Sequence, residues 1–280
     1  MPEETSHDRI EKIGNSQIQH GKHNDRIYLM KLDSNDFPEI IVTLNDLANQ
    51  KGYSKIFAKI PLGYGNEFFK DGYGVEARVP NFYRGVEDGL FLAKYFYFGR
   101  RKLPQKELLD FKGMVGNIPL QGEIFLDSRF RCLKPAAADA EDMSKLYGKV
   151  FPSYPFPIHE GDYLRQTMRE NTVYFGIWES GELIALASAE MDLDSFNVEM
   201  TDFAVLPEYR GNQLALFLLK QMELEMKDRG MKTAYTIARL KSAAMNVTFL
   251  KSGYQYGGTL IHNTNICGGL ESMNVWFKTL

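Results

Sequence analysis

The sequence predicts an α/β fold in which helices and strands pack around a mixed sheet (α+β). Three observations lead to this prediction. Short apolar runs rich in β-branched and aromatic residues alternate with runs in which apolar residues recur at helical spacing. The chain has 280 residues, of which 44% are hydrophobic and 25% charged, so a sizeable core can form. The same succession of elements also occurs twice along the chain.

Composition narrows the partners that we expect. A net charge of -3 argues against a nucleic-acid partner, since a basic face would be expected for one. The two cysteines, Cys132 and Cys267, lie far apart and form no CxxC pair, so neither a disulfide framework nor a metal site is expected. No run approaches the ~20 apolar residues of a membrane span, and the acidic start lacks an apolar signal region. We therefore expect a cytoplasmic protein without a membrane partner.

Both halves of the chain carry strand-like and helix-like runs in a similar order. In the first half we expect strands at 13–19, 26–32, 55–60, 73–80 and 90–96, with helices at 38–50 and 66–70. In the second half we expect strands at 130–133, 173–178, 183–190, 198–206, 233–238, 256–263 and 273–278, with helices at 137–150, 159–170, 243–250 and from 213 to a stop at 230.

Local sequences recur with this order. Phe68–Tyr73 matches Phe249–Tyr254, and Gly52 matches Gly230 at nearly the same offset. We therefore expect an internal duplication with a truncated half-domain at 1–98, a linker at 99–128 and a complete domain at 129–280. The basic cluster at the start of the linker is expected to be solvated.

The stretch Thr201–Lys220 organises the second copy as a strand, a sharp turn and a helix. Pro207 ends the strand because it has no N–H to donate. The helix that follows carries apolar residues at helical spacing, namely Ala215, Leu218, Leu219, Met222 and Met226. The turn therefore places unpaired backbone N–H groups at a helix N-terminus, where a phosphate or pyrophosphate binds well.

The first copy differs at the equivalent turn. Its sequence Leu32–Pro38 contains no arginine and no glycine, and it adds acidic residues. These acids would repel a pyrophosphate, so we expect only the second copy to bind one and the first to be a degenerate, non-catalytic half-domain.

The turn Arg210–Ala215 resembles the acyl-CoA-binding motif of the GNAT acetyltransferase superfamily, and the order of elements from Arg129 onward is the GNAT order. Arg210 and Ala215 match the ends of the motif, whereas Gln213 replaces its inner glycine. The resemblance implies the GNAT fold, acetyl-CoA as co-substrate and no metal. The cofactor-binding residues that it implies are Phe203, Ala204, Val205, Leu206, Arg210, Gly211, Asn212, Gln213, Leu214, Ala215, Ser242 and Phe249.

The C-terminal stretches are similar to the β-lysine N-acetyltransferase family. They are Met245–Tyr254, Gly258–Asn265 and Glu271–Trp276. This resemblance implies direct transfer of an acetyl group to the terminal amine of β-lysine (3,6-diaminohexanoate), giving N-ε-acetyl-β-lysine in lysine or compatible-solute metabolism. The residues themselves indicate only the reaction class.

The chemistry requires a base, because a free amine with a pKa of ~10.4 arrives as ammonium at neutral pH. Glu199 and Asp202 lie on the strand that enters the motif, and Glu199 stands where GNAT enzymes often carry the base. In a regular strand these two side chains would point to opposite faces, so only one would reach the acceptor. The backbone N–H groups of Ala204 to Leu206 are expected to stabilise the oxyanion.

The proton donor to the thiolate is less clear from the residues. The position of the usual GNAT tyrosine is Phe249 here, so Tyr254, Tyr256 or water would have to protonate the thiolate. Ser242 could hydrogen-bond the pantetheine or cap the following helix.

An aromatic loop between the two helices at 137–170, together with the C-terminal strands, is expected to line the acceptor cleft. The expected substrate-binding residues are Tyr154, Phe156, His159, Glu160, Arg165, Asn263 and Asn265. Arg165 is the expected partner of the substrate carboxylate, because arginine pairs with carboxylates through two parallel hydrogen bonds.

Two alternatives stay open. The acceptor could be another amine, such as a polyamine, an aminoglycoside or a protein lysine. The departures at Gln213 and Phe249 would also fit a non-catalytic acyl-CoA sensor. The oligomeric state is open, with a homodimer as one possibility.

Overall fold

A computed structural model describes residues 8–116, 118–120, 122–266 and 268–280. Cys267 lies outside the described residues. The first half contains β1 (Arg9–Ile13), β2 (Ser16–Gly21), β3 (Arg26–Lys31), α1 (Ile40–Lys51), β4 (Lys55–Pro61), α2 (Gly65–Lys70), β5 (Gly74–Tyr83) and β6 (Glu87–Tyr95). The helix α1 forms because Ile40, Ile41, Leu44 and Ala48 make one buried face, and it ends at Gly52 in a left-handed conformation.

The second half follows a helix, α3 (Gln105–Val115), that lies in the expected linker. Its elements are β7 (Phe130–Leu133), α4 (Ala140–Val150), α5 (Gly161–Glu170), β8 (Thr172–Glu179), β9 (Glu182–Asp192), β10 (Asn197–Val205), α6 (Leu214–Asp228), β11 (Thr233–Arg239), α7 (Ala243–Lys251), β12 (Gln255–Ile266) and β13 (Gly269–Thr279). The helix α6 packs along β8, β9 and β10, and α4 and α5 pack against β8 to β10 as well.

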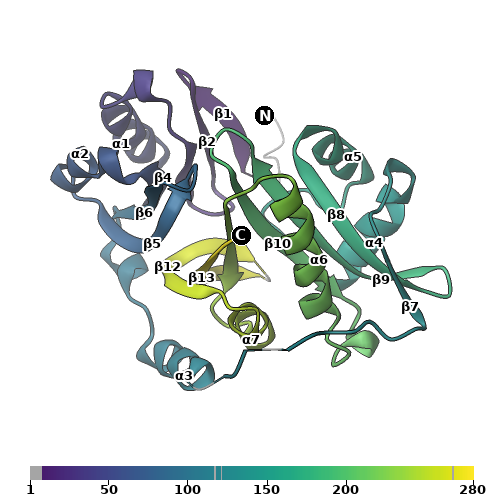
Figure 1. Ribbon diagram of the computed structural model, residues 1–280. Helices are drawn as coiled ribbons and strands as arrows, with labels where there is room; N and C mark the ends of the chain where they lie inside the picture. Colours follow the sequence, from purple (N-terminus) through teal and green to yellow (C-terminus); the bar gives the residue numbers. More distant parts are fainter. Residues whose placement is uncertain (1–7, 117, 121, 267) are drawn as a thin grey trace.

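The strands of the described residues form one 13-stranded sheet, with the order β1-β2-β3-β4-β6-β5-β12-β13-β11-β10-β9-β8-β7 (Figure 1). Both copies contain one parallel pair, β3 with β4 and β10 with β11, followed by antiparallel strands in the same sequence. The strand order of the first copy is therefore the reverse of the strand order of the second. The two copies meet in the middle of the sheet, where β5 pairs with β12. The predicted α/β fold with a mixed sheet is confirmed.

The seam between the copies depends on a close backbone approach. Gly258 on β12 pairs with Ala77 on β5, and a Cβ atom at Gly258 would lie 2.1 Å from the carbonyl oxygen of Glu76. Only glycine fits there. One apolar cluster crosses the seam, joining Phe57 and Phe91 of the first copy to Tyr235 and Val275 of the second. The sheet is thus continuous in both its backbone and its core.

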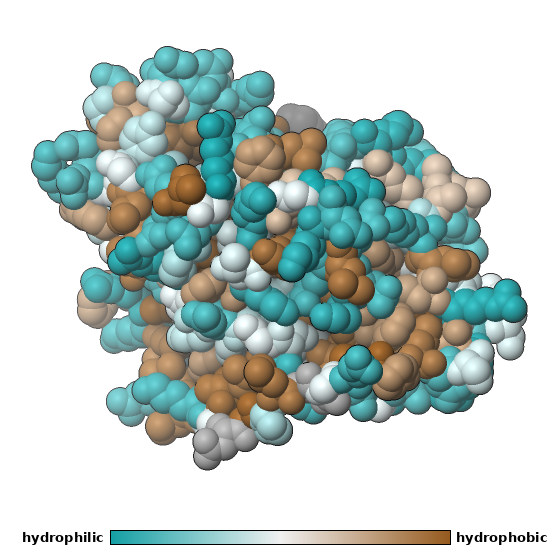
Figure 2. Space-filling model, in the orientation of Figure 1, coloured by the Kyte–Doolittle hydropathy of each residue, from teal (hydrophilic) through white to brown (hydrophobic). Residues whose placement is uncertain are grey.

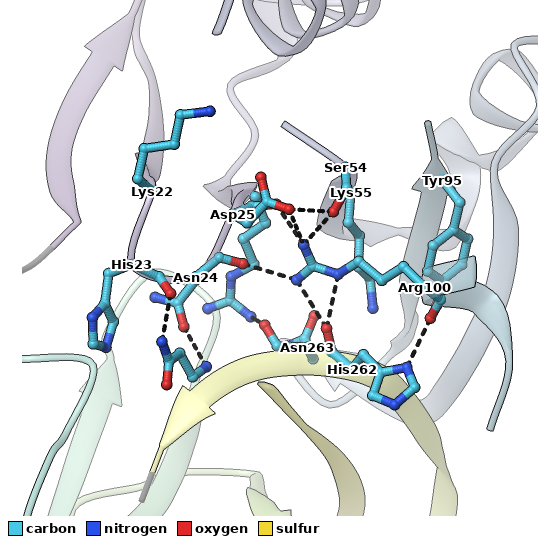
Figure 3. Close-up of polar contacts among 12 residues, drawn as sticks. Lys22, His23, Asn24, Asp25, Ser54, Lys55, Tyr95, Arg100, His262 and Asn263 are labelled. Atoms are coloured by element: carbon cyan, nitrogen blue, oxygen red, sulfur yellow. Dashed lines mark hydrogen bonds and ion pairs between the residues drawn. The ribbon is translucent and has the colours of Figure 1, made fainter. Parts of the chain in front are cut away.

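The expectation that the basic cluster after β6 is solvated is wrong for Arg100. Its side chain is buried, and it donates hydrogen bonds to the carbonyl oxygens of Asn24 (2.8 Å) and His262 (2.9 Å) and to Ser54 Oγ (2.7 Å) (Figure 3). A buried guanidinium can satisfy several carbonyl groups from different segments at once, because it has five donors in a plane. Arg100 therefore ties β12 to the first copy.

Two elements were missed by the sequence patterns. Residues 13–19 were expected to be one strand, but a turn at Gly14 divides them between β1 and β2. The helix α3 lies in the stretch that was expected to be linker. Apart from these, the predicted strands and helices are present with small shifts at their ends.

No helix of the described residues is long and apolar enough to cross a membrane.

Candidate active site

The strands β10 and β11 separate partway along their length. They pair in parallel only from Asn197 with Thr233 to Glu199 with Tyr235. Beyond that point a cavity of about 560 Å³ lies between them, and this is the larger of two adjoining cavities. The separation leaves backbone groups of both strands without a neighbouring strand on this side.

The turn from β10 to α6 borders the larger cavity. Gly211 has a φ of 89°, and Gln213 has a φ of 58° in the left-handed region, which glycine adopts more easily. Arg210 is exposed beside them. The backbone therefore folds here as the glycine-containing motif would require, although glutamine occupies the inner position. Apolar surface gathers around the N-terminal end of α6 and around α7 (Figure 2).

Most of the residues expected to bind the cofactor line the larger cavity. They are Phe203, Val205, Arg210, Gly211, Gln213, Leu214, Ala215, Ser242 and Phe249. Ala204 and Leu206 are buried instead, and the N–H of Leu206 donates to the carbonyl of Ile184 (3.0 Å), so it is not free for an oxyanion. Asn212 binds the Tyr209 carbonyl and the side chain of Arg129.

Ser242 and Phe249, at the start and near the end of α7, both line the larger cavity. The hydroxyl of Ser242 makes no capping hydrogen bond, and Asn246 holds this turn by donating to the carbonyl of Ser242 (2.8 Å). Phe249 is buried between Phe203 and Tyr254, with both rings edge-on to it. Its ring therefore closes the end of the larger cavity.

A second cavity of about 200 Å³ continues from the first and lies between the two copies. The two cavities share the wall residues Tyr154, Thr201, Asp202, Ile237, Ile266 and Met273. The smaller cavity is charged: Glu190, Asp192, Glu199 and Asp202 line it from the second copy, and Arg26 and Lys59 line it from the first. A polar ligand in it would meet a ligand of the larger cavity near Asp202.

Glu199 and Asp202 both reach the smaller cavity, so the expectation that strand alternation separates them is wrong. Asp202 has a φ of 55°, and the pairing of β10 with β9 shifts by one residue between Thr201 and Ala204. This β-bulge turns the following side chains by one position. A bulge thus puts two carboxylates on one side of the strand.

The pKa values of three carboxyl groups in this cluster, Glu190, Glu199 and Asp202, are raised. For Asp202 the hydrogen bonds from Tyr154 Oη and from Ser188 Oγ (2.7 Å) partly oppose the rise. Burial raises the pKa of Glu199, although the charge of Lys59 and the hydroxyl of Tyr235 oppose it. Glu190 faces the cavity, yet the surrounding protein and its neighbours Asp202 and Glu199 raise its pKa well above the ordinary value. Such carboxylates hold protons more tightly than exposed ones and suit general-base chemistry near neutral pH.

Comparison with known proteins identifies the family. Residues 140–254 match the model of the acetyltransferase (GNAT) family. The chain is 42% identical over 272 residues to the β-lysine N(6)-acetyltransferase of Methanococcus maripaludis, an alignment that covers 97% of this chain and 98% of the relative. The chain is a GNAT N-acetyltransferase.

Two other relatives match about half of this GNAT chain. The N-acetyltransferase YodP of Bacillus subtilis is 44% identical over 54% of this chain and 55% of its own length. The β-lysine N(6)-acetyltransferase of Methanosarcina mazei is 38% identical over 53% of this chain and 55% of its own. GNAT enzymes use acetyl-CoA, which agrees with a groove beside the N-terminus of α6.

Some expected substrate residues of the GNAT chain lie at the smaller cavity and others do not. Tyr154, Phe156 and Asn263 line it. His159 and Glu160 are exposed in the loop before α5, and Asn265 donates to the carbonyl of His23 (2.8 Å) outside the lining. His159, Glu160 and Asn265 therefore do not line either cavity.

Arg165 is placed away from both cavities, which corrects the expectation that it meets a substrate carboxylate. It lies on α5 and pairs with Glu141 and Asp162, both at 2.8 Å. The spacing of Asp162 and Arg165, three residues apart on a helix, favours such a local ion pair.

Tyr254 is also placed differently from the expected catalytic role. Its ring is buried behind Phe249 and lies near Glu223, outside the lining of both cavities. Tyr154, by contrast, lies on the wall that the cavities share, and its hydroxyl donates to Asp202 Oδ1. Burial raises the pKa of Tyr154 well above its usual value, so the hydroxyl stays protonated.

Sequence patterns missed the residues that the first copy contributes. Arg26, Tyr28 and Lys59 lie on β3 and β4, which looked like ordinary strands of a degenerate domain. The only local signal is that buried strands rarely carry arginine or lysine, so a charged side chain within them suggests a partner.

Proposed function

We propose that this GNAT protein transfers the acetyl group of acetyl-CoA to the terminal amine of β-lysine. The observation that carries the proposal is a small charged cavity that opens into the larger groove at Asp202. One side of it is acidic, which suits ammonium groups, and the other carries the cation Arg26, which suits a carboxylate. A relative of nearly the same length is named for this substrate.

The residues of the larger cavity fit acetyl-CoA. The 15-residue helix α6 presents its N-terminus to the groove, and Gly211 and Gln213 hold the backbone that would cradle a pyrophosphate. Ala215 leaves room for the close approach because its side chain is small. The separated edge of β10 offers backbone groups to which an amide-bearing chain could hydrogen-bond.

The base in the proposed reaction is Glu199. The acceptor enters as ammonium, and a carboxylate with a raised pKa takes its proton more readily than an ordinary one at neutral pH. Asp202 lies closer to the groove, and its two oxygens already accept hydrogen bonds, so we assign it to orient the amine. The freed amine attacks the thioester carbonyl, the carbon–sulfur bond breaks and the thiolate leaves.

The proposed proton donor to the thiolate is Tyr154 rather than Tyr254. Only Tyr154 of the two lines the shared wall of the cavities. Its hydroxyl proton, held against Asp202, can pass to the sulfur, the second proton of the attacking nitrogen then returns to Tyr154, and the proton taken by Glu199 leaves to solvent. The thiolate is also a tolerable leaving group, with a pKa of ~8.5, so we expect the donor to assist the step and not to be essential.

The first copy, residues 1–98, is in this proposal a non-catalytic half-domain joined through residues 99–128 to the catalytic domain at 129–280. Its turn between β3 and α1 is occupied by its own acids, and no residue of that turn lines either of the two cavities. It serves the active site by supplying the far wall of the smaller cavity.

An amine panel tests the proposed function. Release of free CoA from acetyl-CoA would be measured with β-lysine, α-lysine, spermidine and cadaverine. We expect kcat/KM for β-lysine to exceed that for cadaverine by well over the ~10–200-fold that a lost methylene gives, because charged groups are at stake. Equal use of the two would indicate a general polyamine acetyltransferase. Tight acetyl-CoA binding without turnover would indicate an acyl-CoA sensor.

A further inference from the structure

Arg26 on β3 brings a cation into the smaller cavity from the first copy. The side chain is 4% exposed and lines the cavity. Burial lowers its pKa to about 10, so it still carries its charge at neutral pH. Its electrostatic neighbours are Tyr28, Arg100, Asp8 and Glu76, and none of these is a carboxylate of the acidic wall.

The guanidinium of Arg26 is only partly satisfied. Nη1 donates to the carbonyl oxygen of Asn263 and to Thr264 Oγ1 (3.3 Å), whereas Nε is buried without a hydrogen-bond partner. The rings of Tyr28 and Phe57 hold the group from the side, 5.4 and 5.7 Å from its central carbon. Among the described residues no carboxylate lies within ion-pair distance of it. A buried cation without an anion is costly, so this position is suited to receive one.

Lys59, the other cation of the cavity, is in a different situation. Its Nζ donates to Tyr235 Oη (3.0 Å). Burial lowers its pKa, but Tyr28, Glu199 and Asp192 together raise it above the ordinary value. The charge of Lys59 is therefore already balanced by the acidic wall, and Arg26 is the better partner for an incoming anion.

The bulged part of β12 places a second unsatisfied group beside Arg26. Two extra residues separate the pair Leu260–Met273 from the pair Thr264–Glu271. Two side chains bind the freed backbone. Lys55 of the first copy donates to the Ile261 carbonyl (2.8 Å). Arg100 of the linker donates to the His262 carbonyl (Figure 3). Asn263 follows, 1% exposed, with its Oδ1 buried and without a donor. Lys55 and Arg100 thus hold the backbone that precedes Asn263.

We propose that Arg26 binds the carboxylate of the acceptor and that Asn263 Oδ1 accepts a hydrogen bond from its 3-ammonium group. This inference rests on the proposed function and deepens it, because it assigns the recognition of the acceptor to Arg26 of the first copy together with Asn263 of the second. In β-lysine the two groups are separated by one methylene and lie at the end remote from the acetylated amine. An arginine and an amide oxygen side by side match that pair. The acceptor class is an amino acid with a remote primary amine.

Steady-state kinetics of Arg26→Gln with β-lysine and cadaverine test the carboxylate contact. We expect kcat/KM for β-lysine to fall by about 30-fold or more, mainly through KM, because a buried charge pair is lost. Turnover of cadaverine should rise, since its second ammonium no longer faces a cation. Arg165→Gln, which removes a surface arginine, is the matched control and should change neither substrate. Equal loss for both substrates in folded Arg26→Gln would overturn the inference.

Arg26→Lys keeps the charge and covers the case in which Arg26→Gln does not fold. We expect its KM for β-lysine to rise about 10-fold with kcat nearly unchanged, because lysine cannot form the bidentate pair. An unchanged KM would overturn the inference. The two proposals fail separately: if the wild type does not prefer β-lysine to cadaverine, the proposed function fails, whereas a preference that survives in Arg26→Gln refutes only the role of Arg26.

The amide contact has its own substrate. 6-Aminohexanoate keeps the carboxylate and the reacting amine but lacks the 3-ammonium. Asn263→Ala should lower kcat/KM for β-lysine about 10-fold and leave 6-aminohexanoate within about twofold, because only β-lysine loses a hydrogen bond. A similar loss for both would mean that Asn263 acts only through packing.

Discussion

The two copies of the unit differ most at the turn between the first strand and the first helix. In the second copy Arg210 and Gly211 leave this turn open toward the larger cavity. In the first copy Asp36 fills it, accepting hydrogen bonds from the backbone of Asn15 (2.9 Å) and from the backbone and hydroxyl of Ser16 (2.7 and 2.6 Å). In the first copy the Asp36 carboxylate thus occupies this turn. In the second copy the equivalent turn is free to bind an anion.

The parallel strand pairs differ in the same sense. β3 and β4 pair over four residues from Arg26 with Lys55 to Leu29 with Ala58, whereas β10 and β11 pair over three before a cavity separates them. In the first copy neither of the two cavities separates the paired strands β3 and β4. Arg26 and Lys59 of these strands line the smaller cavity opposite the second copy. The comparison shows that the half without an open groove at this turn still contributes side chains to the smaller cavity.

The largest effect is expected from the base in the second copy. Glu199→Gln should lower kcat about 10²–10⁴-fold, as expected for a lost general base. Burial raises the pKa of Glu199, so the wild-type rate should rise with pH as this group loses its proton, and the variant should lack that acidic limb. A pH profile of kcat/KM measures both. Unchanged activity at neutral pH would move the role to Asp202.

A smaller effect is expected from the proton donor. Tyr154→Phe should lower kcat about 10-fold, because the thiolate leaves less easily without a nearby hydroxyl. Tyr254→Phe is the matched control and should leave kcat nearly unchanged, since its ring lies behind Phe249. Single-turnover measurements of CoA release separate this step from product release. The reverse ranking of the two variants would restore Tyr254 as the donor.

Asp36 of the first copy and Glu190 of the second should have opposite effects on the free energy of unfolding at neutral pH. Hydrogen bonds from Ser16 lower the pKa of Asp36, so its contribution is present above the unfolded pKa and is lost as pH falls through the folded pKa. The surrounding protein and the neighbouring Asp202 and Glu199 raise the pKa of Glu190 at the cavity, so its contribution is present below the unfolded pKa and is lost as pH rises through the folded pKa. At pH 7, Asp36→Asn should therefore lower Tm and Glu190→Gln should raise it.

Thermal unfolding between pH 3 and 8 checks this pair of predictions. The gain of Glu190→Gln should vanish near pH 4, and the loss of Asp36→Asn should shrink below that pH. If both variants shift Tm in the same direction at pH 7, the contrast between the two acids is wrong.

The smallest effect concerns the inner position of the turn. Gln213→Gly should stabilise the protein by up to about 1 kcal/mol, because a left-handed conformation costs a side-chain-bearing residue about that much. Ser180→Gly, at a φ of 50° in the β8–β9 turn, is a control that should give a similar gain without touching the groove. Acetyl-CoA affinity should be unchanged or tighter in Gln213→Gly. A weaker affinity would mean that the glutamine side chain itself contacts the cofactor.

Much of the fold could be predicted because the spacing of apolar residues and the glycines and prolines that end helices and strands are local features of the sequence. The buried stripe of α6 and its stop at Gly230 followed from spacing alone, and the matched segments around Phe68 and Phe249 predicted that the order of elements recurs, as it does. The resemblance at Arg210–Ala215 located the groove for the same reason, since a turn and a helix N-terminus are contiguous in sequence.

The acceptor side of the site could not be predicted in the same way. The bulge at Asp202 has no local signal, because an aspartate with a positive φ breaks the alternation on which the expectation rested. Arg26 and Asn263 are more than two hundred residues apart, and only the sheet order brings them together. Arg165 was wrongly predicted to bind the substrate carboxylate because it lies near the aromatic loop in the sequence. In the structure its charge is paired with Asp162, three residues earlier on the same helix.

Calorimetry of Gly211→Asp with acetyl-CoA tests the division between the copies most directly. A Cβ atom at Gly211 would meet no protein atom within 4 Å, so lost binding would report the positive φ and the added charge and not a clash within the protein. Gly211→Ala isolates the backbone strain. We predict one binding site per wild-type chain, at least about 100-fold weaker binding in Gly211→Asp and normal binding in Asp36→Asn. Two sites per chain, or binding that survives in Gly211→Asp and disappears in Asp36→Asn, would contradict the account.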